Sequence, residues 1–171
     1  MARAKRVTGM IAAFCGATAA LGSAAQARTI YIVQVDIWHV YSLTNSCIAY
    51  NRPINDYNQS PYNSLTLHAP KGGGLLVGVA FWPGLFTAGS PYKLALRADP
   101  GDRFQVDVKA AYDYDLKSVD PLPAELVQQL AKAKFVTVRV ADVPATLAFD
   151  TTRMREVLDH LDHCRGLIEE G

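Results

Sequence analysis

The sequence has 171 residues, of which half are hydrophobic and 19% are charged, a balance that excludes a disordered chain and supplies apolar side chains for a core. Its formal charge of +1 argues against an electrostatic binder of nucleic acid, which needs a clustered basic face.

The first 27 residues have the three parts of a secretory signal peptide in the usual order. Residues 3–6 are mostly basic, residues 9–21 form a short apolar stretch, and Ala25-Gln26-Ala27 has the small-x-small cleavage pattern. The apolar stretch is too short and too interrupted for a stable membrane span. We therefore expect cleavage after residue 27, which leaves one β-rich domain, residues 28–171, in the periplasm or outside a bacterial cell. That domain has 14 basic and 16 acidic residues, a formal charge of −2.

Two cysteines, Cys47 and Cys164, remain after cleavage. In an oxidising compartment they favour a disulfide, which would tie an early strand to the last helix. The alternative is a reactive thiol or metal pair, but the sequence offers no CxxC pattern and no third ligand.

The mature chain opens with β-branched and aromatic residues that predict one strand over residues 30–41, in which His39 shares a face with Val35 and Ile37. A turn leads to a second strand, residues 47–50, and then to a polar, aromatic loop.

Residues 64–69 alternate, which predicts that Leu65 and Leu67 point inward while Thr66 and His68 point outward. After three glycines, residues 75–82 are apolar on both faces, a pattern typical of a central strand.

Residues 92–99 and 104–111 alternate in the same way on either side of Pro100-Gly101-Asp102, and they predict an antiparallel hairpin with one face in water. The acidic segment 113–120 resembles a calcium loop, but Ser118 and Ala124 stand where an EF-hand needs glycine and glutamate. We therefore interpret it as a solvated loop.

The spacing then predicts a helix over residues 123–134, strands over 135–140 and 146–149, and a last helix capped by Asp150 or Thr151. The apolar stripe of that last helix comprises Met154, Val157, Leu158, Leu161, Cys164 and Ile168. The predicted fold is mainly β, an antiparallel β-sandwich or partly open barrel with one inserted helix and a C-terminal helix.

Catalytic and metal-binding patterns are weak. His160 and His163 are neighbours on the last helix and could share a metal, but their spacing differs from that of HExxH, and a solvated helix face explains them better. The glycines at 72–74 precede a strand rather than a helix, and no GxSxG pattern occurs. We expect no cofactor, and no residue is assigned a catalytic role.

Binding candidates are clearer. Tyr50, Tyr57 and Tyr62 alternate with asparagines in the loop after the second strand, a combination typical of binding loops. Trp82 and Phe86 could add an exposed apolar patch. The alternative for all these aromatics is packing within or over the core.

A Trp-x-Val strand at Trp38-His39-Val40, a Cys-x-Ala strand at Cys47-Ile48-Ala49 and a last helix with Cys164 resemble small secreted bacterial proteins of the invasion-associated locus B type and their uncharacterised relatives. The resemblance implies a β-sandwich and a periplasmic accessory or envelope role, and it transfers no enzymatic mechanism.

These observations favour a non-catalytic periplasmic binding or accessory protein, in which a disulfide-tied β scaffold presents the Tyr/Asn loop to an envelope protein or glycan. Two alternatives stay open: a secreted metal-dependent hydrolase that uses His160 and His163, and a carrier of a small apolar ligand.

Overall fold

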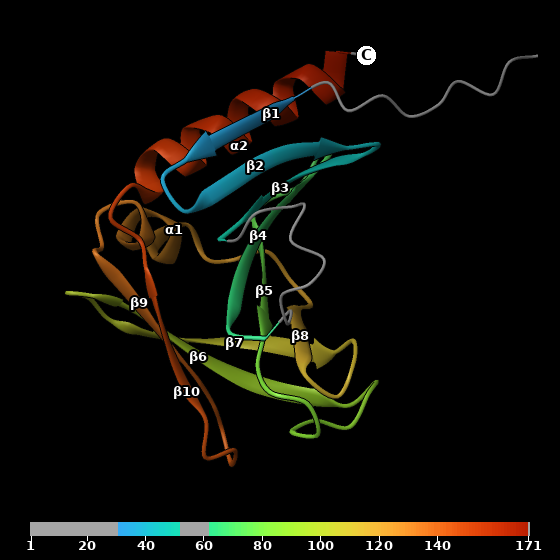
Figure 1. Cartoon of the computed structure of the whole chain (residues 1–171), viewed down its shortest axis with the longest axis vertical. Coiled ribbons are helices and arrows are strands. Elements are labelled where there is room, and N and C mark those ends of the chain that lie inside the picture. The colour runs from blue at the N-terminus through green and yellow to red at the C-terminus, as the bar shows by residue number, and fades with distance from the viewer. Residues whose placement is uncertain (1–30, 52–61, 171) are drawn as a thin grey trace, which may run out of the picture.

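The computed structural model describes residues 31–51 and 62–170. It is mainly antiparallel β, with one helix in the middle of the chain and one at its C-terminal end, as predicted. Ten strands form one continuous sheet in the order β1-β2-β3-β4-β5-β8-β7-β6-β9-β10 (Figure 1). β1 and β10 are its two edges, so the sheet is not closed into a barrel.

The strands are β1 (Ile32–Val35), β2 (Trp38–Leu43), β3 (Ser46–Tyr50), β4 (Ser64–Pro70), β5 (Leu76–Ala80), β6 (Pro91–Asp99), β7 (Arg103–Ala110), β8 (Asp115–Ser118), β9 (Phe135–Val140) and β10 (Thr146–Asp150). The helices are α1 (Ala124–Leu130) and α2 (Met154–Glu170).

The first predicted strand is in fact a hairpin. Val35 pairs with Trp38, so only two residues form the turn between β1 and β2, and Asp36 adopts the left-handed conformation with φ of 56°. Cross-strand partners share a face, so Val35 and Trp38 both point into the core. The expectation that His39 shares the face of Val35 is therefore wrong, because the turn reverses the alternation and places His39 on the opposite face.

The acidic segment 113–120 is not only a loop. Its residues from Asp115 to Ser118 form β8, which pairs with β5 on one side and β7 on the other. Leu116 points into the core and is fully buried. The hydroxyl of Ser118 accepts a hydrogen bond from the amide of Val77 at 3.0 Å, which adds a link to β5. Two neighbouring strands thus stabilise a segment whose own signal is only four residues long.

One face of the sheet and both helices enclose a single core. As predicted, Leu65 and Leu67 are buried while Thr66 and His68 on the other face of β4 are half-buried. The buried residues of α2 are Met154, Val157, Leu161, Cys164 and Ile168, and Leu158 is half-buried beside them.

α2 packs mainly on β2, β3 and β4 (Figure 1). A disulfide joins Cys47 in β3 to Cys164 in α2, with 6.1 Å between the Cα atoms, as predicted. Before the helix begins, the Thr151 hydroxyl donates to the carbonyl of Ala133 at 3.0 Å, and the carboxylate of Asp150 accepts from the amide of Thr152 at 2.8 Å. Neither of the two described helices is long and apolar enough to cross a membrane.

Candidate functional site

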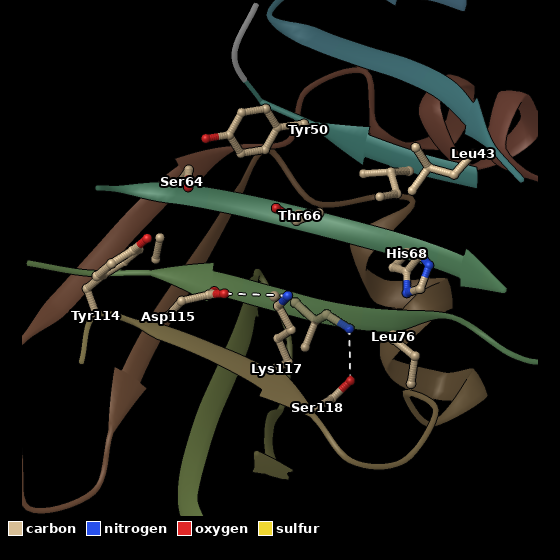
Figure 2. Close-up of a pocket in the computed structure, with 14 residues that line it drawn as sticks. Leu43, Tyr50, Ser64, Thr66, His68, Leu76, Tyr114, Asp115, Lys117 and Ser118 are labelled. Atoms are coloured by element: carbon tan, nitrogen blue, oxygen red, sulfur yellow. Dashed lines mark hydrogen bonds and ion pairs between the residues drawn. The ribbon is translucent and has the colours of Figure 1, made fainter. Parts of the chain in front are cut away.

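A groove with a volume of about 520 Å³ lies on the outer face of β3, β4, β5 and β8 (Figure 2). The alternation along β3 explains its position. Cys47 and Ala49 point to the core and toward α2, whereas Ile48 and Tyr50 line the groove. The groove and the helix therefore lie on opposite faces of β3 and β4, the two strands that both of them contact.

The floor of the groove consists of small side chains. The register sets Thr66 of β4 opposite Gly78 of β5, and Ser64 opposite Ala80. A Cβ atom built on Gly78 would meet only ordinary contacts, the nearest at 3.5 Å from the Cβ of Thr66. Gly78 is thus not required by packing, and its missing side chain leaves the floor open.

Larger side chains on the two flanking strands form the walls. On one side, β3 contributes Ile48 and Tyr50, and Tyr50 pairs with Thr66. On the other side, β8 contributes Asp115 and Lys117, and Lys117 pairs with Gly78. One cross-strand row therefore runs from a tyrosine over the floor to a lysine.

The two charged side chains of the lining form an ion pair, with 3.6 Å between the Lys117 ammonium and a carboxylate oxygen of Asp115. The lysine side chain is 64% exposed, but that of the aspartate is only 17% exposed. Burial raises the pKa of Asp115, and the nearby Lys117 opposes this shift without cancelling it. The carboxylate is thus kept in a place where desolvation disfavours its charge.

His68 occupies the apolar end of the groove, between Ile48 of β3 and Leu76 of β5 in the cross-strand register. Burial lowers the pKa of His68, and the charge of Lys117 lowers it further. The imidazole is therefore neutral at pH 7 and can act as one donor and one acceptor.

Tyrosines gather at the opposite end. The ring of Tyr114, which lines the groove, meets Tyr62 edge to face at 5.1 Å and stacks with Tyr112 at 5.7 Å. Burial raises the pKa of Tyr114, and the carboxylate of Asp115 adds to the shift. Figure 2 shows Tyr50 and Tyr114 at the same end of the groove, away from His68 and Leu76.

The binding residues predicted from the sequence have different surroundings. Tyr50 lines the groove and Tyr62 contacts Tyr114 at its end, whereas Tyr57 lies outside the described residues. Trp82 is 46% exposed, but Phe86 is buried.

Phe86 packs edge to face on Phe81 at 5.5 Å and on Tyr92 at 5.1 Å. The expectation that Trp82 and Phe86 form an exposed apolar patch is therefore wrong, because Phe86 belongs to the core and only Trp82 reaches the surface.

The two helix histidines lie on α2 and do not line the groove. His160 is hydrogen-bonded through Nδ1 to the hydroxyl of Tyr31, and the ring of His163 lies 5.4 Å from the same tyrosine. Within residues 31–51 and 62–170, no three metal-ligating side chains come together. Both histidines thus contribute to the contact between Tyr31 and the last helix.

Several groove residues were not singled out from the sequence, namely Thr66, Gly78, Tyr114 and Lys117, and Asp115 was considered only as part of the acidic segment 113–120. Leu116, one apolar residue in an otherwise polar segment, was the only sign of β8 in the sequence, and it could not by itself reveal this wall of the groove.

A mostly apolar groove with a few polar groups that converge on it is the usual form of a small-molecule site. No protein-family model, curated protein or solved structure matches this chain. The site is therefore defined by its geometry alone.

Proposed function

We propose that this chain is a non-catalytic binding protein of the bacterial envelope, and that the groove on β3, β4, β5 and β8 is its ligand site. The signal-peptide pattern and the pairing of Cys47 with Cys164 support an oxidising, extracytoplasmic location. Tyr50 and Tyr62, which the sequence marks as binding residues, stand at this groove.

The observation that carries the proposal is the construction of the groove itself. A floor of small side chains lies between walls of tyrosine, isoleucine and a paired aspartate and lysine. Its volume of about 520 Å³ falls within the range of small-molecule sites, roughly 300–1,000 Å³. A surface that served only to face water would have no need of such a depression.

The half-buried carboxylate of Asp115 supports the same proposal. Its raised pKa means that the folded protein holds a charge there against the cost of desolvation. Residues kept at such a cost in a cleft are frequent at functional sites. Lys117 pairs with this carboxylate, and a ligand that donates a hydrogen bond to it would offset the remaining cost of desolvation.

The test is a comparison of two variants that place the same side chain on the same face of the sheet. Gly78→Val fills the groove floor, because Gly78 does not have a positive φ that would strain a side chain and its Cβ atom would meet only ordinary contacts. Ala95→Val adds similar bulk to the outer face of β6, outside the groove. Both variants are expected to unfold close to the wild-type temperature.

Each protein is incubated with the low-molecular-mass fraction of a bacterial envelope extract and examined by native mass spectrometry. The wild type and Ala95→Val are expected to acquire the same discrete adduct, and Gly78→Val is expected to lose it. The proposal fails if the wild type acquires no adduct, or if Gly78→Val retains it.

A further inference from the structure

We propose that the ligand of this groove is a short neutral saccharide, an inference that rests on the proposed binding function. It depends on the polar groups that line the groove and on where they stand relative to its apolar surfaces.

The charges of the lining exclude a ligand with a strong net charge. Lys117 and Asp115 already form a pair, so a carboxylate placed at the lysine meets the aspartate, and an ammonium placed at the aspartate meets the lysine. Lys109, the cross-strand partner of Lys117 on β7, is exposed and does not line the groove. A neutral ligand can use both members of the pair through charge-assisted hydrogen bonds.

The polar groups of the groove that a ligand must match include hydrogen-bond donors and acceptors side by side. The ammonium of Lys117 only donates and the carboxylate of Asp115 only accepts, while Thr66 and the neutral imidazole of His68 can do both. In the part of the chain that the structure describes, neither Thr66 nor His68 makes a side-chain hydrogen bond. Hydroxyl groups suit such a lining, because each one both donates and accepts.

The apolar surfaces fit the other side of a sugar ring. A pyranose has hydroxyls around its edge and C–H groups on its faces, and the groove offers the ring of Tyr50 and the side chain of Ile48 next to the polar row. Tyrosine combines an apolar ring with a polar tip, which suits a ligand of this kind. The floor at Gly78 lets a flat ligand approach the backbone closely.

The experiment measures binding of neutral saccharides from one to four units, on an array and then by titration calorimetry, with maltose, cellobiose and N,N′-diacetylchitobiose as soluble probes. Two charged probes serve as controls. Decanoate is an anion with an apolar chain, and spermidine is a cation. Wild-type protein is expected to bind at least one neutral saccharide and neither charged probe.

Two double variants distinguish saccharide binding in this groove from saccharide binding elsewhere on the protein. Asp115→Asn with Lys117→Gln removes both charges from the groove, and loss of two charge-assisted hydrogen bonds is expected to weaken binding by about tenfold or more. Lys93→Gln with Asp107→Asn removes an ion pair from the same face of the sheet outside the groove and should leave the affinity unchanged. Thr66→Ala, a smaller change, should weaken binding in a protein that keeps its fold.

The inference is overturned if no saccharide binds, if a charged probe binds instead, or if Thr66→Ala and the Asp115 and Lys117 variant both bind as the wild type does. If no saccharide binds but the envelope extract still yields an adduct that Gly78→Val loses, the groove remains a ligand site and only the saccharide assignment is wrong.

Discussion

The outer face of this one sheet has two different halves. Over β6 and β7 it has the character of an ordinary solvated surface, with Lys93 paired to Asp107 and Arg97 paired to Asp99 at 3.5 Å. Over β1 to β5 a single cross-strand row contains no carboxylate, lysine or arginine, and it consists of Ile32, Tyr41, Ile48, His68 and Leu76. Both halves have the same apolar inner face. The two halves of the sheet therefore differ in their outer faces and not in the apolar character of their inner faces.

α2 packs mainly on the inner face of β2, β3 and β4. It therefore supports the half of the sheet that contains most of the groove, and not β6 and β7. Of the two strands that carry the small-residue floor, β4 packs from the other side against α2, the helix that is bound covalently to β3. A ligand site needs such a rigid backing, because its walls must keep their spacing when the site is empty.

The largest expected effect comes from removing this covalent link. Cys47→Ser with Cys164→Ser opens a loop of 117 residues, and the chain-entropy argument gives an upper loss of about 4–5 kcal/mol in the free energy of unfolding. Urea unfolding with and without reductant measures the loss. Hydrogen exchange should increase more in β2, β3 and β4 than in β6 and β7, and equal increases in both halves would contradict the separate role of α2.

A charge placed in each half tests the contrast directly. Thr66→Lys puts an ammonium on the half-buried floor near Lys117 and should destabilise the protein by about 1–2 kcal/mol. Gln105→Lys puts it on the exposed face of β7, where surface substitutions usually stay within about 0.5 kcal/mol. Thermal unfolding of the two variants measures this difference in stability. Equal losses of stability would contradict the distinction between the two halves of the outer face.

The ion pairs of the charged half are expected to contribute little. The side chains of Lys93 and Asp107 are 61% and 59% exposed, so Lys93→Gln with Asp107→Asn should cost less than about 1 kcal/mol. The cost should fall further in high salt, because exposed charges are screened. A salt-independent loss above that figure in chemical denaturation would show that this half, too, has a structural electrostatic role.

The smallest expected effect is a pH dependence of the stability that arises from His68 in the groove. The pKa of His68 lies below its ordinary value of 6.5 in the folded protein, so the unfolded chain takes up a proton first as the pH falls. Stability due to this group is therefore complete above pH 6.5 and is lost as the pH falls through the folded pKa. His68→Gln should lose less stability than the wild type between pH 7 and pH 5.

His39, with a pKa lowered by burial, and Asp115, with a raised pKa, remain in both proteins and cancel from that difference. Identical slopes for the wild type and His68→Gln in unfolding titrations would show that the imidazole is not held in its neutral form.

The inner face of the sheet could be predicted because burial imposes a period of two that is visible in the sequence. Leu65 and Leu67 in β4, and Leu94 and Leu96 in β6, point inward as their alternation requires. The apolar stripe of α2 followed in the same way from a period of 3.6 residues.

The turn at Asp36 could not be found by this reasoning. It has no glycine to mark it, and apolar residues continue through Ile37 into β2, so one long strand and two short ones give nearly the same composition. β8 was missed for a related reason, since four residues with a single buried leucine carry too little periodicity to separate a strand from a loop.

The groove was harder still to predict from the sequence. Its lining comes from several strands, and alternation only says that Thr66 or Lys117 points outward. Which outward residues become neighbours depends on the strand order, in which β8 is inserted between β5 and β7. Tyr50 and Tyr62 were found because their residue type suggests binding, whereas Gly78 has no side chain to suggest anything.

The disulfide also sets an order of events during synthesis. Cys164 is separated from Cys47 by 117 positions in the chain, and every strand of the sheet precedes α2. Until α2 has been made, the apolar face of β2, β3 and β4 has no helix to cover it. The disulfide can therefore form only after every strand of the described sheet has been synthesised.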